Sequence, residues 1–231
     1  MLMTITKPTY MSMYDPVLWR CNSHIDDKLV DDLISQIYNY NKIDDSVFNQ
    51  QNKYYSSYYI DESIRPDNIL FQEGGVYYNI ITQVLKDLGF ANRSDITVRH
   101  WMQLYDPNNT GDHQVHDHYS PLVLLSFIHF IRPTDIKCFY FADSDGGKIY
   151  PQQDKGDFIV FPSFAQHGVD PNTLQERSTI VGNIVFNKIY DESRKRDLIL
   201  THEGDTSVLV EKRTDPYVIA RRVIESGVQL T

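Results

Sequence analysis

The chain has 231 residues, of which 31 are acidic and 22 are basic, so its formal net charge is −9 at pH 7. This balance excludes proteins that hold nucleic acid or anionic membranes on an extended basic face. Hydrophobic residues make up 41% and aromatic residues 13%, which excludes a globally disordered chain. The two cysteines, Cys21 and Cys138, form no CxxC pair. They argue against a disulfide scaffold or a thiolate zinc site and favour the reducing cytoplasm.

No segment predicts a signal peptide or a membrane span. The first residues lack a cationic start followed by a long apolar run. The longest apolar run, at 121–131, includes a histidine and is too short to cross a bilayer. A buried β-strand explains this run better.

Residues 1–94 predict a helical region. Apolar residues recur at helical steps over 25–37, with Asn22 or Ser23 as the expected N-cap. A second helix is predicted over 76–88, and Gly89 ends it. The polar segment 42–65 between them predicts an ordered loop.

Residues 95–190 predict a β-rich core. Short runs rich in Val, Ile, Phe and Tyr are separated by turn sequences, which indicates an antiparallel sandwich or barrel. The predicted strands are 96–105, 122–131, 137–142, 157–161 and 179–187. The helices are expected to pack on the outer face of a sheet.

Residues 191–231 predict a C-terminal extension with a strand over 206–212 and a short helix from Pro216 to just before Gly227. The sequence contains no internal repeat. We therefore expect one domain over 1–231, with a helical part at 1–94, a core at about 95–190 and the extension.

Three histidines form a candidate metal site. On a strand, residues i and i+2 share a face, so His116 and His118 converge while Asp117 points away. His167 follows the predicted strand 157–161 and supplies a third imidazole. Such a facial set leaves other coordination positions open, as in non-haem Fe(II) oxygenases.

Arg177 and Thr179 add a candidate carboxylate site. A guanidinium fork inside a barrel holds a carboxylate through two parallel hydrogen bonds. Thr179 lies two residues further on and projects to the same side as Arg177.

The succession MQLY, HDH, KGDFIVFPSFAQHGVDPN and ERST, within residues 96–190, resembles the Fe(II)- and 2-oxoglutarate-dependent dioxygenases of the prolyl-hydroxylase-like branch. The resemblance implies a double-stranded β-helix, a jelly-roll whose mouth holds the metal. It assigns His116 and His167 as metal ligands and Arg177 with Thr179 as the 2-oxoglutarate clamp. Tyr105 is interpreted either as a hydrogen-bonding group toward 2-oxoglutarate or as a residue packed in the sheet.

The resemblance further implies an enzyme that uses Fe(II), O2 and 2-oxoglutarate, with ascorbate as reductant in vitro. It would hydroxylate a peptide side chain or a small molecule and release succinate and CO2. The expected partners include neither nucleic acid nor a membrane.

One position departs from this family's pattern, because His118 stands where an aspartate is expected. Either His118 completes a three-histidine site, or a bulge turns Asp117 inward as the third ligand, or the site is degraded or holds zinc. Two other functions stay open: a cupin-like three-histidine metal protein that does not use 2-oxoglutarate, and a non-catalytic jelly-roll module.

The other histidines have simpler interpretations. His113 is interpreted as a surface-loop residue, and His129 as a core histidine or a residue facing the cosubstrate. The remaining histidines are interpreted as ordinary polar residues: His24, His100 and His202.

Overall fold

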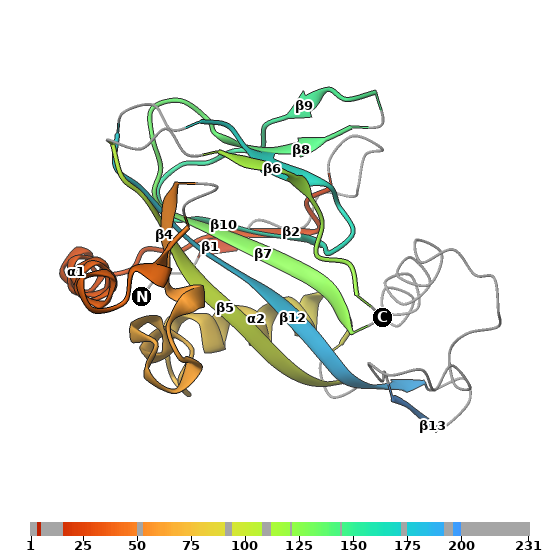
Figure 1. The fold of residues 1–231 in the computed structure, drawn as a ribbon. Helices are drawn as coiled ribbons and strands as arrows, with labels where there is room; N and C mark the ends of the chain where they lie inside the picture. The colour runs from red at the N-terminus through yellow and green to blue at the C-terminus, as the bar shows by residue number, and fades with distance from the viewer. Residues whose placement is uncertain are drawn as a thin grey trace.

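Two antiparallel β-sheets face each other in the computed structural model (Figure 1). The structure describes residues 4–5, 16–49, 53–90, 94–107, 112–120, 122–143, 145–171, 175–191 and 196–199. The larger sheet has nine strands in the order β1-β2-β10-β7-β12-β5-β4-β3, with β13 paired to β12. The smaller sheet has four, in the order β6-β11-β8-β9.

The strands of the larger sheet are β1 (Thr4–Ile5), β2 (Trp19–Asn22), β3 (Phe48–Asn49), β4 (Tyr54–Ser56), β5 (Ser94–Tyr105), β7 (Val123–Arg132), β10 (Asp157–Pro162), β12 (Arg177–Asp191) and β13 (Arg196–Ile199). The strands of the smaller sheet are β6 (His113–His116), β8 (Phe139–Ala142), β9 (Lys148–Ile149) and β11 (His167–Val169). All five predicted strands are present, and β12 extends beyond its predicted bounds at both ends.

Helices α1 (Asp27–Ile43) and α2 (Val76–Asp87) cover the outer face of the larger sheet, as predicted. Their buried side chains form one apolar cluster with Met102, Leu104, Ile180 and Ile184 from β5 and β12. Figure 1 shows the smaller sheet on the other side of the larger one. The space between the sheets is therefore separate from the helical layer.

The start of α1 differs from its prediction. Asp26 is the N-cap, and its carboxylate accepts a hydrogen bond from the backbone N–H of Leu29. Asp26 also precedes Asp27 in the first turn, where negative charge suits the helix dipole. The predicted end of α2 agrees with the structure, where Gly89 takes a left-handed conformation with φ 79°.

The prediction of a loop over 42–65 is wrong in part. This segment contains β3 and β4, together with short 3-10 helices at Asp45–Val47, Ser57–Tyr59 and Glu62–Ile64. Strand β4 pairs with β5 and adds Tyr54 to the inner face of the larger sheet. Strands of two or three residues are too short to produce an alternating pattern in the sequence.

Alternation along β5 and β12 separates the two faces of the larger sheet. Met102 and Leu104 face the helices, whereas Tyr105 belongs to a second apolar cluster between the sheets. The same alternation directs Ile180 toward the helices. Because successive residues of a strand point to opposite faces, one strand can supply both the helical interface and a site between the sheets.

The predicted C-terminal strand at 206–212 and the helix after Pro216 lie outside the described residues. Among the helices that the structure describes, none is long and apolar enough to cross a bilayer.

Candidate metal centre and anion pocket

Three histidines meet between the two sheets. The ligand atoms of His116, His118 and His167 all lie within 4.8 Å of one another. Their ring centres are 4.5 Å apart for His116 and His167, 5.0 Å for His116 and His118, and 5.1 Å for His118 and His167. This spacing suits three imidazoles around one metal ion.

Pairing of β6 with β11 brings the histidines together. His116 lies directly opposite His167 in the ladder, although the two residues are far apart in the chain. The backbone N–H of His118 donates to the carbonyl of Ser163 at 2.8 Å, which ties the segment after β6 to the segment before β11. The three side chains are therefore placed by backbone hydrogen bonds.

Hydrogen bonds to carbonyl groups define the tautomers of two of these imidazoles. Nδ1 of His116 lies 2.8 Å from the carbonyl oxygen of Gln114, and Nδ1 of His167 lies 2.8 Å from that of Ala165. A carbonyl only accepts, so each Nδ1 carries the proton and each neutral ring presents an unprotonated Nε2. In metalloproteins, a hydrogen bond from one ring nitrogen of a histidine commonly orients the other nitrogen toward the metal.

Two of the rings are strongly biased toward the neutral form. Burial, followed by the neighbouring His116, lowers the pKa of His118 to about 4 and that of His167 to about 3. A neutral imidazole offers a lone pair to a metal, whereas an imidazolium does not. Both residues are therefore available as ligands at neutral pH.

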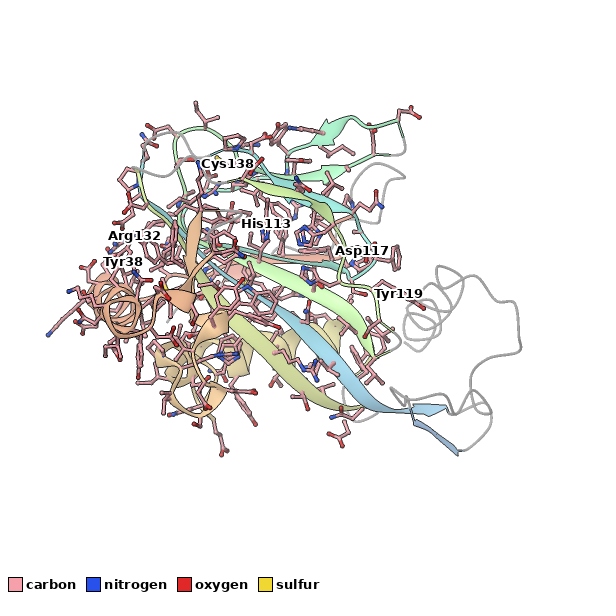
Figure 2. The ribbon with its side chains drawn as sticks, in the orientation of Figure 1. Tyr38, His113, Asp117, Tyr119, Arg132 and Cys138 are labelled. Carbon is pink, nitrogen blue, oxygen red and sulfur yellow. The ribbon has the colours of Figure 1, made fainter. Side chains whose placement is uncertain are left out.

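Asp117 lies apart from this group. Its side chain is exposed, and its carboxylate accepts a hydrogen bond from the backbone N–H of Tyr119 at 3.1 Å. Figure 2 shows Asp117 and Tyr119 near one end of the space between the sheets. Within the described residues, the third member of the group is His118.

A fourth histidine, His113, also lines this cavity, so its interpretation as a surface-loop residue is wrong. His113 pairs with Val169 while His116 pairs with His167, so three steps along β6 match two along β11. The resulting bulge brings His113 to within 4.8 Å of His116 between ring centres. Figure 2 labels His113 between the sheets. Strict alternation would have placed these two residues on opposite faces.

Arg177 forms a second polar feature on the opposite sheet. It lies directly across from Tyr105 in the β5–β12 ladder, and Thr179 lies across from Gln103. The guanidinium carbon of Arg177 is 3.7 Å from the centre of the Tyr105 ring, close enough for a cation–π contact. All four side chains line one pocket, so the structure brings together Arg177, Thr179 and Tyr105.

Three polar atoms of this pocket lack hydrogen-bond partners among the described residues. Nε and Nη2 of Arg177 and the hydroxyl oxygen of Thr179 are buried and have no hydrogen-bond partner among the described residues. Only 4% of the Arg177 surface is exposed. An unpaired buried guanidinium costs several kcal/mol, so the arrangement suits an anion that enters the pocket and pairs with it.

The anion pocket adjoins the histidine cavity, and the two share Gln103, Ile128, Phe139 and Val169 as lining residues. The described lining of the histidine cavity includes no carboxylate and is otherwise largely apolar or aromatic. A ligand with an anionic end could therefore reach from Arg177 toward the three histidines.

His129 and His100 belong to the protein core. Nε2 of His129 donates to the carbonyl of Ser23 at 2.8 Å, and its Nδ1 accepts from the Tyr77 hydroxyl at 2.6 Å. His100 stacks on Phe71 with ring centres 3.5 Å apart. Because Tyr77 and Phe71 pack in the helix-side cluster, neither histidine faces the metal site.

Comparisons with known proteins identify the fold. No protein-family model and no curated protein matches the sequence. The structure is similar to the non-heme alpha-ketoglutarate-dependent carbocyclase SnoK from nogalamycin biosynthesis, with TM-score 0.52 and 12% identity over 78% of this chain and 87% of that one.

Two further solved structures are similar. AviO1 from Streptomyces viridochromogenes Tue57 has TM-score 0.51 and 11% identity over 72% of this chain and 89% of that one. A prolyl-4-hydroxylase from Pseudomonas putida has TM-score 0.49 and 15% identity over 72% of this chain and 91% of that one. The likeness to SnoK and AviO1, with the two antiparallel sheets, confirms the predicted double-stranded β-helix.

Proposed function

We propose that this chain is an Fe(II)- and 2-oxoglutarate-dependent oxygenase. The observation that carries the proposal is the buried guanidinium of Arg177, whose Nε and Nη2 have no hydrogen-bond partner among the described residues, in a pocket that adjoins three converging histidines. One site suits a divalent transition metal, and the other suits a carboxylate. The residues present thus fit both groups that such an enzyme requires.

The three histidines would hold the metal. His116 and His167 turn Nε2 toward the centre because their Nδ1 atoms donate to backbone carbonyls. His118 completes the set in the position where this family's pattern has aspartate. Three protein ligands on one side leave the opposite side open for the cosubstrate and O2.

Arg177 would bind the far carboxylate of 2-oxoglutarate. The contact with the Tyr105 ring would help to position the guanidinium, and its Nε and Nη2 would donate to the anion. Thr179 would add a hydroxyl donor. The ring of Tyr105 would contact Arg177, and its hydroxyl would hydrogen-bond toward 2-oxoglutarate. This holds the 2-oxo acid end toward the metal.

The apolar lining would keep water from the reacting groups. Phe139 and Phe161 flank His167, with ring centres 5.6 and 5.1 Å from its own. When bound, the metal and 2-oxoglutarate supply the oxidation, in which O2 and 2-oxoglutarate are consumed, succinate and CO2 are released and the substrate is hydroxylated. The protein contributes orientation and a dry cavity.

The proposal extends to the whole chain as one oxygenase domain over residues 1–231, acting in the cytoplasm. The reducing compartment agrees with Cys21 and Cys138, which are both buried and unpaired. The proposed substrate is a peptide side chain or a small molecule, and the proposed partners include neither nucleic acid nor a membrane. Ascorbate would keep the iron reduced in vitro.

Spectroscopy and product analysis test the proposal. Under anaerobic conditions, Fe(II) and 2-oxoglutarate together should give a weak visible charge-transfer band that neither gives alone. With O2 and ascorbate, the protein should release succinate, and candidate peptides and small molecules should raise its rate. Absence of both the band and succinate, in protein shown to bind metal, would contradict the proposal and favour a metal protein that does not use 2-oxoglutarate.

A further inference from the structure

The candidate ligand set of the centre contains no anionic side chain. His116, His118 and His167 contribute imidazoles, and no carboxylate lines the cavity among the residues that the structure describes. The positively charged Arg177 lies in the adjoining pocket. The protein ligands would therefore not neutralise any of the charge of a divalent ion bound here.

The nearest carboxylate in the sequence is held away from the centre. Asp117 lies between two of the ligands in the chain, but its side chain is exposed and accepts the backbone N–H of Tyr119. Backbone pairing holds the neighbouring residues, because His116 pairs with His167 and the N–H of His118 donates to Ser163. Bringing the Asp117 carboxylate inward would break its hydrogen bond to the N–H of Tyr119.

Donor type governs which ions bind a site of given geometry. Imidazole suits Fe, Co, Ni, Cu and Zn, whereas carboxylate suits Mg and Mn. An additional anionic oxygen ligand favours Mn²⁺ more than an additional neutral nitrogen does. The chemistry at position 118 should thus decide how strongly the centre rejects Mn²⁺.

We propose that His118 is the metal-selectivity residue of this centre: its imidazole makes the ligand set neutral and favours Fe(II) and Co²⁺ over Mn²⁺. This inference rests on the proposed metal site and concerns metal choice, so it can fail while the oxygenase proposal stands. It assigns no metal-binding role to Asp117.

Competition dialysis tests the inference without any catalytic readout. Metal-free protein is dialysed against equal concentrations of Mn²⁺ and Co²⁺ in the absence of 2-oxoglutarate, and the bound metals are then measured by elemental analysis. The variants are H118D and H118E, with their neutral isosteres H118N and H118Q as matched controls and D117N as the control for Asp117. Thermal unfolding establishes that each variant is folded.

The wild-type protein should bind mostly Co²⁺. At least one acidic variant should shift the Mn²⁺/Co²⁺ ratio toward Mn²⁺ by about tenfold relative to its amide partner, because only the acidic side chain adds an anionic oxygen. D117N should retain the wild-type ratio. Unchanged ratios in both acidic variants, or loss of bound metal in D117N, would overturn the inference. Failure of the wild-type protein to bind any metal would overturn the proposed function as well.

Discussion

The guanidinium carbon of Arg177 lies over the ring of Tyr105, its partner across the β5–β12 ladder, 3.7 Å from the ring centre. This cation–π contact leaves part of the guanidinium available for hydrogen bonds. Nε and Nη2 remain unpaired within the described residues. These two atoms of Arg177 could therefore donate hydrogen bonds to an anion in the pocket.

Replacing Arg177 should therefore weaken 2-oxoglutarate binding strongly while sparing the metal. Removal of one partner from a buried charge pair costs about 2–5 kcal/mol, so R177Q should lower 2-oxoglutarate affinity by about 30-fold or more. Titration calorimetry with the metal-loaded protein measures this loss. R132Q is the matched control, because Arg132 bonds Asp31 and Glu176 at the surface. Equal affinity of R177Q and wild type would contradict the clamp.

His113 and His167 should respond differently to removal of the imidazole. H167F removes a member of the ligand group, so metal binding should be lost. His113 lines the same cavity but stands outside that group, and its Nε2 lies 3.5 Å from the Tyr54 hydroxyl. H113F should therefore keep one metal ion per chain, measured by elemental analysis after dialysis. Loss of the metal in H113F would make His113 a ligand.

Trp101 should report metal binding by fluorescence. Its ring centre lies 6.1 Å from that of His118, and it lines the histidine cavity, whereas Trp19 is fully buried on the helix side of the larger sheet. Co²⁺ at the three histidines should quench the Trp101 emission and leave that of Trp19. The quenching should vanish in W101F, and quenching that persists there would place the bound ion elsewhere.

Acid should destabilise the protein partly through His129. Burial lowers the pKa of His129 from 6.5 to about 4. Between these values the unfolded chain binds a proton that the folded chain does not, so the free energy of unfolding falls as the pH falls. The maximum slope is about 1.4 kcal/mol per pH unit for one histidine, with no further loss from this group below the folded pKa.

Urea unfolding across that pH window, on wild type and H129Q, isolates this contribution because the other buried histidines titrate in both proteins. H129Q should be less stable at neutral pH, because it loses the imidazole that hydrogen-bonds both Tyr77 and Ser23. Its free energy of unfolding should also depend less steeply on pH. Identical slopes for the two proteins would exclude His129 as a source of the acid sensitivity.

Local patterns in the sequence were sufficient to predict the core of the fold. Apolar runs such as 123–131 form strands that are buried on both faces, and helical spacing defined the buried side of α1. The two-residue period of a strand predicted that His116 and His118 converge, and they do, although β6 ends at His116 and His118 is held by its backbone bond to Ser163. Their grouping with His167 was proposed from residue type and position after a predicted strand, and the family resemblance supported it, because strand pairing is a long-range property that local patterns do not define.

Register shifts and very short strands lay beyond such reasoning. His113 enters the cavity because β6 gains a residue relative to β11, a mismatch between segments about fifty residues apart in the chain. Tyr54 joins the inner face through β4, which is held by its pairing with β5 rather than by a pattern of its own. Both features depend on partners that the local sequence does not identify.

The two halves of the site lie on different sheets, with His116 and His167 on the smaller sheet and Arg177 with Thr179 on the larger one. A molecule that ligates the metal at one end and pairs with Arg177 at the other acts as a cross-link through the middle of the sandwich. Separation of the sheets then requires that both attachments break. Ligand occupancy and resistance to proteolysis should consequently rise together in this protein.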